Sequence, residues 1–103
     1  MNVGRLVFRI HALRRMFERR ITEVDVRDVL EHGETIEDRP DDLPYPSRLV
    51  LGRVNGPALS LSKGRPLHVV AADNRAAREL IVVTVYEPDR RQWRAGFRRR
   101  SKR

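Results

Sequence analysis

The chain has 103 residues, of which 40% are hydrophobic and 35% charged, and its formal net charge is +8. This length fits one domain with a modest core, and no apolar run is long enough to cross a bilayer. The absence of cysteine excludes disulfides and thiolate metal sites, and it agrees with the cytoplasmic location that we expect.

Residues 5–9 predict a short edge strand, and a helical spacing of apolar residues follows over about residues 10–20. The apolar positions share the side that an amphipathic helix turns to the core: Ile10, Leu13, Met16 and Phe17. His11 and Arg15 stand one turn apart on the polar side. They could help to bind a phosphate, or they could simply solvate the start of the helix.

A second helix is predicted over residues 23–32. Thr22 is a good N-cap, and Asp25 three residues later completes a short capping box. Gly33 follows the last periodic residue, where we expect it to end the helix in the left-handed conformation.

Strands joined by short loops follow, so the expected fold is α+β. Two N-terminal helices should pack on one face of a three- to four-stranded antiparallel sheet. The strand candidates are residues 35–38, 48–54, 67–72 and 80–87. The connection at residues 55–66 is long for a hairpin, and its stretch at 57–64 indicates a protruding loop or an extended hairpin.

Alternation along the strands assigns side chains to the two faces of this sheet. The bulkier aliphatic set should face the helices: Leu49, Leu51, Leu67, Val69, Ile81, Val83 and Val85. A shallow polar pocket is then predicted on the open face, lined by Arg48, His68, Thr84 and Tyr86.

An arginine, a histidine and a tyrosine in one pocket suit the cleavage of RNA without a metal. His68 could exchange a proton with the 2′-hydroxyl or the 5′-oxygen. Arg48 could hold the phosphoryl oxygens, and Tyr86 could donate a hydrogen bond or stack under a base. A purely structural role for His68 and Tyr86 is the alternative. No histidine has a carboxylate at metal-ligand spacing, so neither a metal nor a cofactor is predicted.

The whole excess of positive charge lies in residues 90–103, RRQWRAGFRRRSKR. This stretch holds eight basic residues and no acidic one, whereas residues 1–89 hold 14 of each sign. We therefore divide the chain into a domain at 1–89 and a basic tail at 90–103. Trp93 and Phe97 stand four residues apart in this stretch. They could pack on the domain as one turn of helix, with Trp93 anchoring a tail whose arginines are solvated, or they could stack on RNA bases. In the second case the backbone would be bound by Arg98, Arg99 and Arg100.

Several motifs together resemble the bacterial family catalogued as domain of unknown function 4258. They are HALRRMFERR with the glycine-ended second helix, PYPSR, RPLHVV and VTVYEPD, and the resemblance spans about residues 8–97. This family is similar to the RelE/ParE-like toxins. Carried over to this chain, the resemblance implies site residues at His11, Arg15, Arg48, His68 and Tyr86.

The resemblance also implies a role as the toxin of a type II toxin–antitoxin system. The toxin would be an endoribonuclease acting on mRNA, free or on the ribosome, and its protein partner would be a cognate antitoxin. Two other functions fit the same residues. A non-catalytic module would use the basic tail to bind nucleic acid or an acidic partner. A ParE-like inhibitor of a protein target would keep the fold without the catalytic chemistry.

Overall fold

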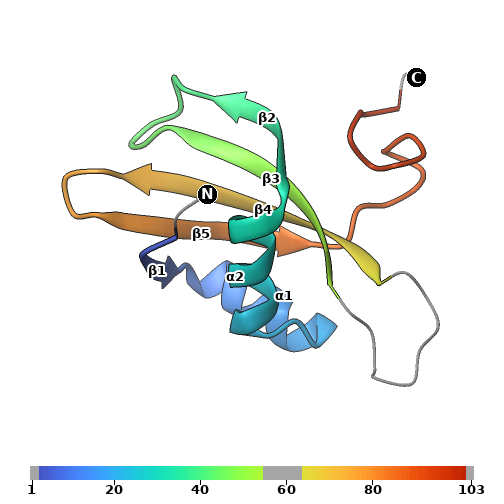
Figure 1. Cartoon of the computed structure of the whole chain (residues 1–103), viewed down its shortest axis with the longest axis horizontal. Coiled ribbons are helices and arrows are strands. Elements are labelled where there is room, and N and C mark those ends of the chain that lie inside the picture. Colours follow the sequence, from blue (N-terminus) through green and yellow to red (C-terminus); the bar gives the residue numbers. More distant parts are fainter. Residues whose placement is uncertain (1–2, 55–63, 102–103) are drawn as a thin grey trace.

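Over the residues that the structure describes, the chain folds as two helices and one five-stranded mixed sheet (Figure 1). This computed structural model describes residues 3–54 and 64–101. The elements are β1 (Arg5–Phe8), α1 (Ile10–Arg19), α2 (Glu23–His32), β2 (Glu34–Arg39), β3 (Ser47–Val54), β4 (Arg65–Asn74) and β5 (Glu79–Tyr86). The strands lie in the order β1-β5-β4-β3-β2. The loop predicted at 57–64 lies, up to residue 63, outside the described residues.

The predicted α+β class is confirmed, but the sheet is larger than predicted and is not wholly antiparallel. β1 pairs in parallel with β5, from Arg5 opposite Glu79 to Phe8 opposite Val82. The other three strand pairs are antiparallel. Because most of the chain separates β1 from β5, no short turn fixes their relative direction. Strand periodicity therefore could not predict the parallel pair.

The two helices contact different strands. α1 runs on from β1 along β5, and the Arg9 amide donates to the Val82 carbonyl at 3.0 Å at the junction. α2 packs on β3 and β4 instead. The buried side chains of both helices nevertheless join one hydrophobic core, which includes Met16 of α1 and Val29 of α2.

The sequence signals at the ends of α2 have different outcomes. The Asp25 amide donates to Thr22 Oγ1 at 3.1 Å and the Thr22 amide donates to Asp25 Oδ2 at 2.9 Å, so the predicted capping box is confirmed. Gly33 has φ −78° and ψ 180°, so the predicted left-handed cap is wrong. A Cβ at Gly33 would overlap the Val29 carbonyl oxygen and lie 2.6 Å from that of Leu51. Close packing of the helix end on β3 therefore explains this glycine.

Both faces of the sheet bury side chains. We call the side packed against α2 the helix face, and the side that carries His68 the second face. The helix face contributes Val50, Val54, Leu67, Val69, Ala71, Leu80, Val82 and Val85 to the core. Because neighbouring residues of a strand point to opposite sides, Leu49, Leu51, His68 and Ala72 lie on the second face.

The predicted assignment of faces is inverted on β3. Leu49 and Leu51 were expected to face the helices because they are bulkier than their neighbours, but they are buried on the second face. The helix face carries Gly52 instead, where a Cβ would lie 2.8 Å from Val29 Cγ2. α2 approaches β3 so closely that the helix face needs a small residue at this position. Side-chain volume therefore predicts the wrong face for the residues of β3.

On β5 the alternation is broken by a bulge. Val70 pairs with Thr84 and Ala71 pairs with Val82, so Val83 is an extra residue in the ladder. Val82 and Val85 can then both face the core. The prediction for Val85 is confirmed, as it is for Leu67 and Val69. It is wrong for Ile81, opposite Ala72, and for Val83, which lines a second-face hollow with Val70 and Ala72.

Candidate functional site

The pocket predicted from strand alternation does not form, because Arg48 and His68 lie on opposite faces of the sheet. Arg48 pairs with Ala71, a helix-face residue, whereas His68 pairs with Leu51. These pairs are three positions apart along the ladder, or roughly 10 Å at the usual rise of a strand. The expected placement of Arg48 beside His68 is therefore wrong. Arg48 instead lines two hollows that both include Asp73.

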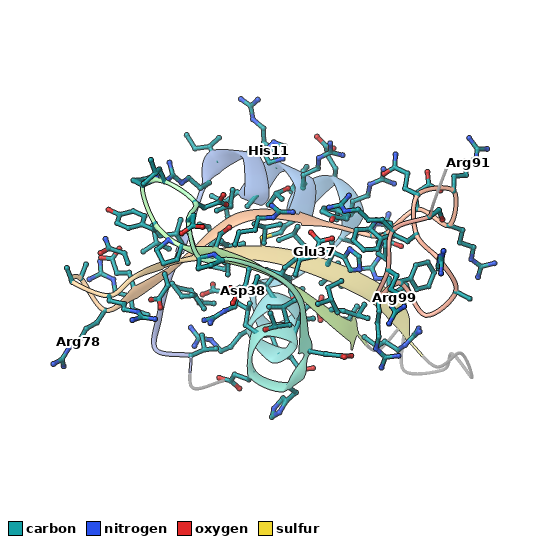
Figure 2. All side chains as sticks on the ribbon, turned by 90° about the horizontal axis from the view of Figure 1, so that it is seen from above. His11, Glu37, Asp38, Arg78, Arg91 and Arg99 are labelled. Carbon is teal, nitrogen blue, oxygen red and sulfur yellow. The ribbon has the colours of Figure 1, made fainter. Side chains whose placement is uncertain are left out.

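The other predicted residues form two further groups. His11 Nε2 and Thr84 Oγ1 are 3.0 Å apart on an exposed part of the surface between α1 and β5. Arg15 is exposed one turn further along α1. Figure 2 shows His11 on α1, Arg91 and Arg99 in the same half of the molecule, and Arg78 at the opposite end. Of the four side chains assigned to one pocket, the structure keeps His68 and Tyr86 together.

His68 is fully buried on the second face, and both of its ring nitrogens have a partner. Nε2 lies 2.9 Å from the Phe97 carbonyl oxygen, and Nδ1 lies 3.3 Å from the Tyr86 hydroxyl. A carbonyl can only accept, so Nε2 carries the proton and donates it, and the Tyr86 hydroxyl donates to Nδ1. The Trp93 ring meets the imidazole edge to face at 4.4 Å between centroids.

Burial holds this imidazole in its neutral form. Loss of solvent lowers the pKa of His68 below its ordinary value, although the bond to the Phe97 carbonyl opposes the shift. Burial also raises the pKa of the Tyr86 phenol. The His68 imidazole and the Tyr86 phenol are therefore both neutral at pH 7. A neutral histidine can act as a general base, but here its free lone pair is already occupied by the Tyr86 hydroxyl.

The stretch that covers His68 is the basic tail itself. From residue 90 to Ser101 it folds back on the second face as a small loop, which we call the C-terminal segment. The Arg94 amide donates to the Arg99 carbonyl at 2.8 Å, and the Ser101 amide donates to the Gln92 carbonyl at 2.8 Å. Trp93 is only 3% exposed. Trp93 therefore anchors the tail to the second face, but through a non-helical loop and not through one turn of helix.

Ion pairs with β2 hold the C-terminal segment in place. Arg98 Nε donates to Glu34 Oε2 at 2.6 Å, and Arg100 donates to both carboxylate oxygens of Glu37 at 2.9 and 3.2 Å. The Arg100 bond is the main reason why the pKa of Glu37 is lowered. The Arg100 guanidinium also lies over the Trp93 ring, 4.6 Å from its centroid. Two of the three arginines expected to bind RNA are therefore engaged within the fold.

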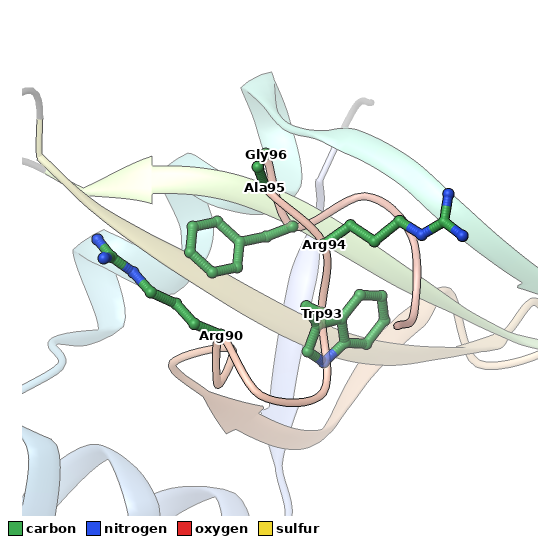
Figure 3. Close-up of a pocket in the computed structure, with 6 residues that line it drawn as sticks. Arg90, Trp93, Arg94, Ala95 and Gly96 are labelled. Carbon is green, nitrogen blue, oxygen red and sulfur yellow. The ribbon is translucent and has the colours of Figure 1, made fainter. Parts of the chain in front are cut away.

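The C-terminal segment encloses a hollow of about 310 Å³ (Figure 3). It is lined by Arg90, Trp93, Arg94, Ala95, Gly96 and Phe97. Its volume is at the lower end of the range for small-molecule sites. Among the described residues, the side chains of Arg90 and Arg94 form no ion pair. The hollow therefore combines two available cations with aromatic surface.

Sequence reasoning missed part of this hollow. Arg90 and Arg94 were not among the predicted site residues, although the arginine-rich stretch around Trp93 and Phe97 was a usable signal. Gly96 and Phe97 both have positive φ, of 87° and 60°, and this turn presents the Phe97 carbonyl to His68. A left-handed phenylalanine is uncommon, so the turn could not be foreseen from residue types.

Comparison with known proteins identifies the family. The model described as "Domain of unknown function (DUF4258)" matches residues 8–87, and the chain belongs to this family. The match ends at Glu87, before the C-terminal segment, and is shorter than the expected span of 8–97. No curated protein and no solved structure matches the chain. Within residues 3–54 and 64–101, the helices are too short or too polar to span a bilayer.

Proposed function

We propose that this member of the DUF4258 family is an RNA-binding protein, and that the hollow of its C-terminal segment and the exposed arginines around it form the binding surface. The hollow beside Phe97 would take a base, and Arg90 and Arg94 would take the phosphates that flank it. The observation that carries this proposal is the pairing of two uncommitted guanidinium groups with an aromatic-lined hollow.

The charges of the C-terminal segment support a polyanionic ligand. Arg98 and Arg100 are used within the fold, but Arg90, Arg91, Arg94 and Arg99 are exposed and make no ion pair with other described residues. Four cations on one short loop attract a phosphate backbone without regard to sequence. A protein with this charge distribution is expected to bind RNA tightly at low salt and weakly at high salt.

The aromatic side chains favour a single strand over a duplex. Phe97 is half-buried and lines the hollow, so part of its ring is available for contact. Unpaired bases stack on aromatic rings of this kind, whereas the bases of a duplex are already stacked on each other. This geometry favours the non-catalytic binding module among the functions suggested by the sequence.

The binding test uses a fluorescein-labelled, mixed-sequence single-stranded RNA and fluorescence anisotropy over a range of salt concentrations. Arg94→Ala should weaken binding and reduce the slope of log K against log salt by about 1. Phe97→Leu, which keeps an apolar side chain but removes the ring, should weaken binding by roughly fivefold or more. Arg78→Ala at the opposite end of the molecule is the matched control. Equal weakening by Arg78→Ala, or no binding at low salt, would contradict the proposal.

A second candidate function is RNA cleavage by the His68–Tyr86 pair, and one observation favours it. The C-terminal segment covers this pair through contacts made by Trp93, Arg98 and Arg100 with the second face and β2. Its release would expose a histidine and a tyrosine on a sheet face, beside the arginines of the segment itself. Arg48 would take no part, because it lies on the helix face.

Cleavage is tested by incubating RNA with the wild-type protein, Trp93→Ala and the double variant Trp93→Ala/His68→Ala. If the segment masks a catalytic pair, Trp93→Ala should cut faster than wild type and the double variant should not cut. Intact RNA with all three proteins, while binding persists, would leave only the binding function.

The resemblance to RelE/ParE-like toxins is part of this proposal. It makes mRNA in the cytoplasm the expected ligand and a cognate antitoxin the expected partner. Induced expression in a bacterial host, with growth and total mRNA followed together, tests the toxin role. Growth arrest that Phe97→Leu relieves would support it. Arrest without mRNA loss, insensitive to Phe97→Leu, would favour a ParE-like inhibitor.

A further inference from the structure

α1 turns a row of large apolar side chains toward solvent. Ile10 is 71% exposed, Leu13 is 49% exposed and Phe17 is 89% exposed. They follow the spacing i, i+3 and i+7, so they lie along one side of the helix. We call these three residues the α1 stripe. The sequence predicted that this row would face the core.

The core takes a different side of α1. Ala12 and Met16 are the buried residues of this helix, and they pack with the helix face of the sheet. The α1 stripe is thus separate from the buried side of the helix, and α1 has two apolar sides. Contiguous exposed apolar rows on soluble proteins mark interaction sites.

The charges beside the α1 stripe restrict what can cover it. Arg14 lies between Ile10 and Phe17 in the sequence and on the same side of the helix. The exposed cations on and next to α1 are Arg9, Arg14, Arg15, Arg19 and Arg20, whereas Glu18 is the only acidic residue of the helix. A ligand for this surface should therefore combine apolar side chains with negative charge.

We propose that the α1 stripe is a docking surface for an acidic amphipathic helix of a partner protein. Apolar side chains at helical spacing on the partner would pack on Ile10, Leu13 and Phe17. Its flanking carboxylates would pair with the arginines around them, which favours association and orients the partner. This proposal does not rest on RNA binding by the C-terminal segment.

The alternatives fit the observations less well. RNA would satisfy the arginines, but its backbone offers no aliphatic surface to cover Ile10 and Leu13. A second copy of the chain would bring the same excess of arginines to both sides of the contact. An acidic helix satisfies both the apolar row and the charge.

The C-terminal end of α1, which carries part of the α1 stripe, is fixed by hydrogen bonds. The Arg65 guanidinium donates to the carbonyl oxygens of Arg19 and Arg20 at 3.1 and 2.9 Å. It also pairs with Glu87 at 3.2 Å. These bonds tie the C-terminal end of α1 to the ends of β4 and β5. A helix fixed in this way loses little conformational freedom on binding, which favours affinity.

The experiment uses the full chain and three fluorescein-labelled synthetic peptides of about three heptads each. The first has leucine on one helical side with glutamate and alanine elsewhere, the second is a scramble of the same composition, and the third replaces glutamate by lysine. Anisotropy measures binding to wild type, Phe17→Ser and Arg14→Ala. Leu43→Ser is the matched control, because Leu43 is an apolar side chain that is 92% exposed on a different loop.

We expect the acidic amphipathic peptide alone to bind, and Phe17→Ser to weaken it by roughly tenfold. Arg14→Ala should weaken it less, with the loss disappearing at high salt, and Leu43→Ser should have no effect. Equal binding of the scrambled peptide, or no effect of Phe17→Ser, would overturn the proposal. So would a wild-type dimer in sedimentation that Phe17→Ser dissociates, or a loss of RNA binding in Phe17→Ser. Phe17 is so exposed that its replacement should leave the fold intact.

Discussion

The two faces of the sheet are buried by different chemistry. The helix face contributes aliphatic side chains to the buried core, among them Leu67 and Val69. His68 lies between these two residues on the same strand and points to the second face. There it is buried among Tyr86, Trp93 and the Phe97 carbonyl. Aliphatic packing depends mainly on volume. A buried imidazole needs specific donors and acceptors, so only one position of the C-terminal segment satisfies it.

This difference separates stability from site geometry. The helix face should govern whether the chain folds, and the second face should govern where the C-terminal segment lies. The variants below are expected to distinguish these roles, in decreasing order of effect.

The largest effect is expected from Leu67→Ala on the helix face. Leu67 is fully buried, so its truncation leaves a cavity and should cost about 2–5 kcal/mol of unfolding free energy. Urea denaturation followed by circular dichroism measures this loss. A cost below about 1 kcal/mol would mean that the helix-face core is not the main source of stability.

Trp93→Ala should cost less, about 1–3 kcal/mol, because the C-terminal segment can detach while the sheet stays folded. Hydrogen exchange separates the two parts. The amides of Arg94 and Ser101 should lose protection, whereas those of β4 should keep it. Trp93→Phe is the control and should retain most of the protection. Uniform loss across β4 would show instead that the segment and the sheet unfold together.

Stability should fall as the pH is lowered from 7 to 5, because of His68. Its folded pKa is lowered by burial, so the unfolded chain takes up a proton first, near pH 6.5, and is favoured. The stabilisation is complete above that pH and is lost on acidification. The slope from this one group is at most about 1.4 kcal/mol per pH unit. His68→Gln keeps an N–H donor but does not titrate, so its profile should be flatter.

Glu37→Gln should have the smallest effect, about 0.5–1 kcal/mol, because the Arg100 pair is partly exposed. The pKa of Glu37 is lowered in the fold, so the carboxylate stabilises the protein above its ordinary pKa near 4.5 and this contribution is lost on acidification. Thermal unfolding of the variant and wild type should therefore converge at low pH. A gap that persists at a pH low enough to protonate Glu37 in the folded protein would indicate a role other than the ion pair.

The sequence predicted the elements well and the faces poorly. α2 was predicted with its observed bounds, since the Thr22–Asp25 capping box acts locally. The faces of β3 were predicted wrongly because Gly52 lies on the helix face, where α2 packs too closely for a larger residue. This is a tertiary contact, and the alternation of residues along the strand does not reveal it. The parallel pairing of β1 with β5 was not predicted for a similar reason, because it joins residues that are far apart in the chain.

The candidate site was predicted only in part. His68 and Tyr86 were placed together correctly, because they lie in register on neighbouring antiparallel strands. Arg48 was misplaced by the inverted phase of β3. The cover over His68 could not be predicted, because it depends on the left-handed Phe97 and on ion pairs between β2 and residues more than 60 positions away. Local patterns carry no information on such contacts.

The Phe97 carbonyl has a practical consequence for dissecting this protein. The matched family region ends at Glu87, yet it contains an imidazole whose hydrogen-bond acceptor lies ten residues beyond that point. A fragment trimmed to the family boundary would lose this acceptor and the Trp93 ring that packs on His68, and would be prone to misfold. Loss of activity in such a fragment would then report misfolding, so point substitutions are the better tool for assigning roles to the tail.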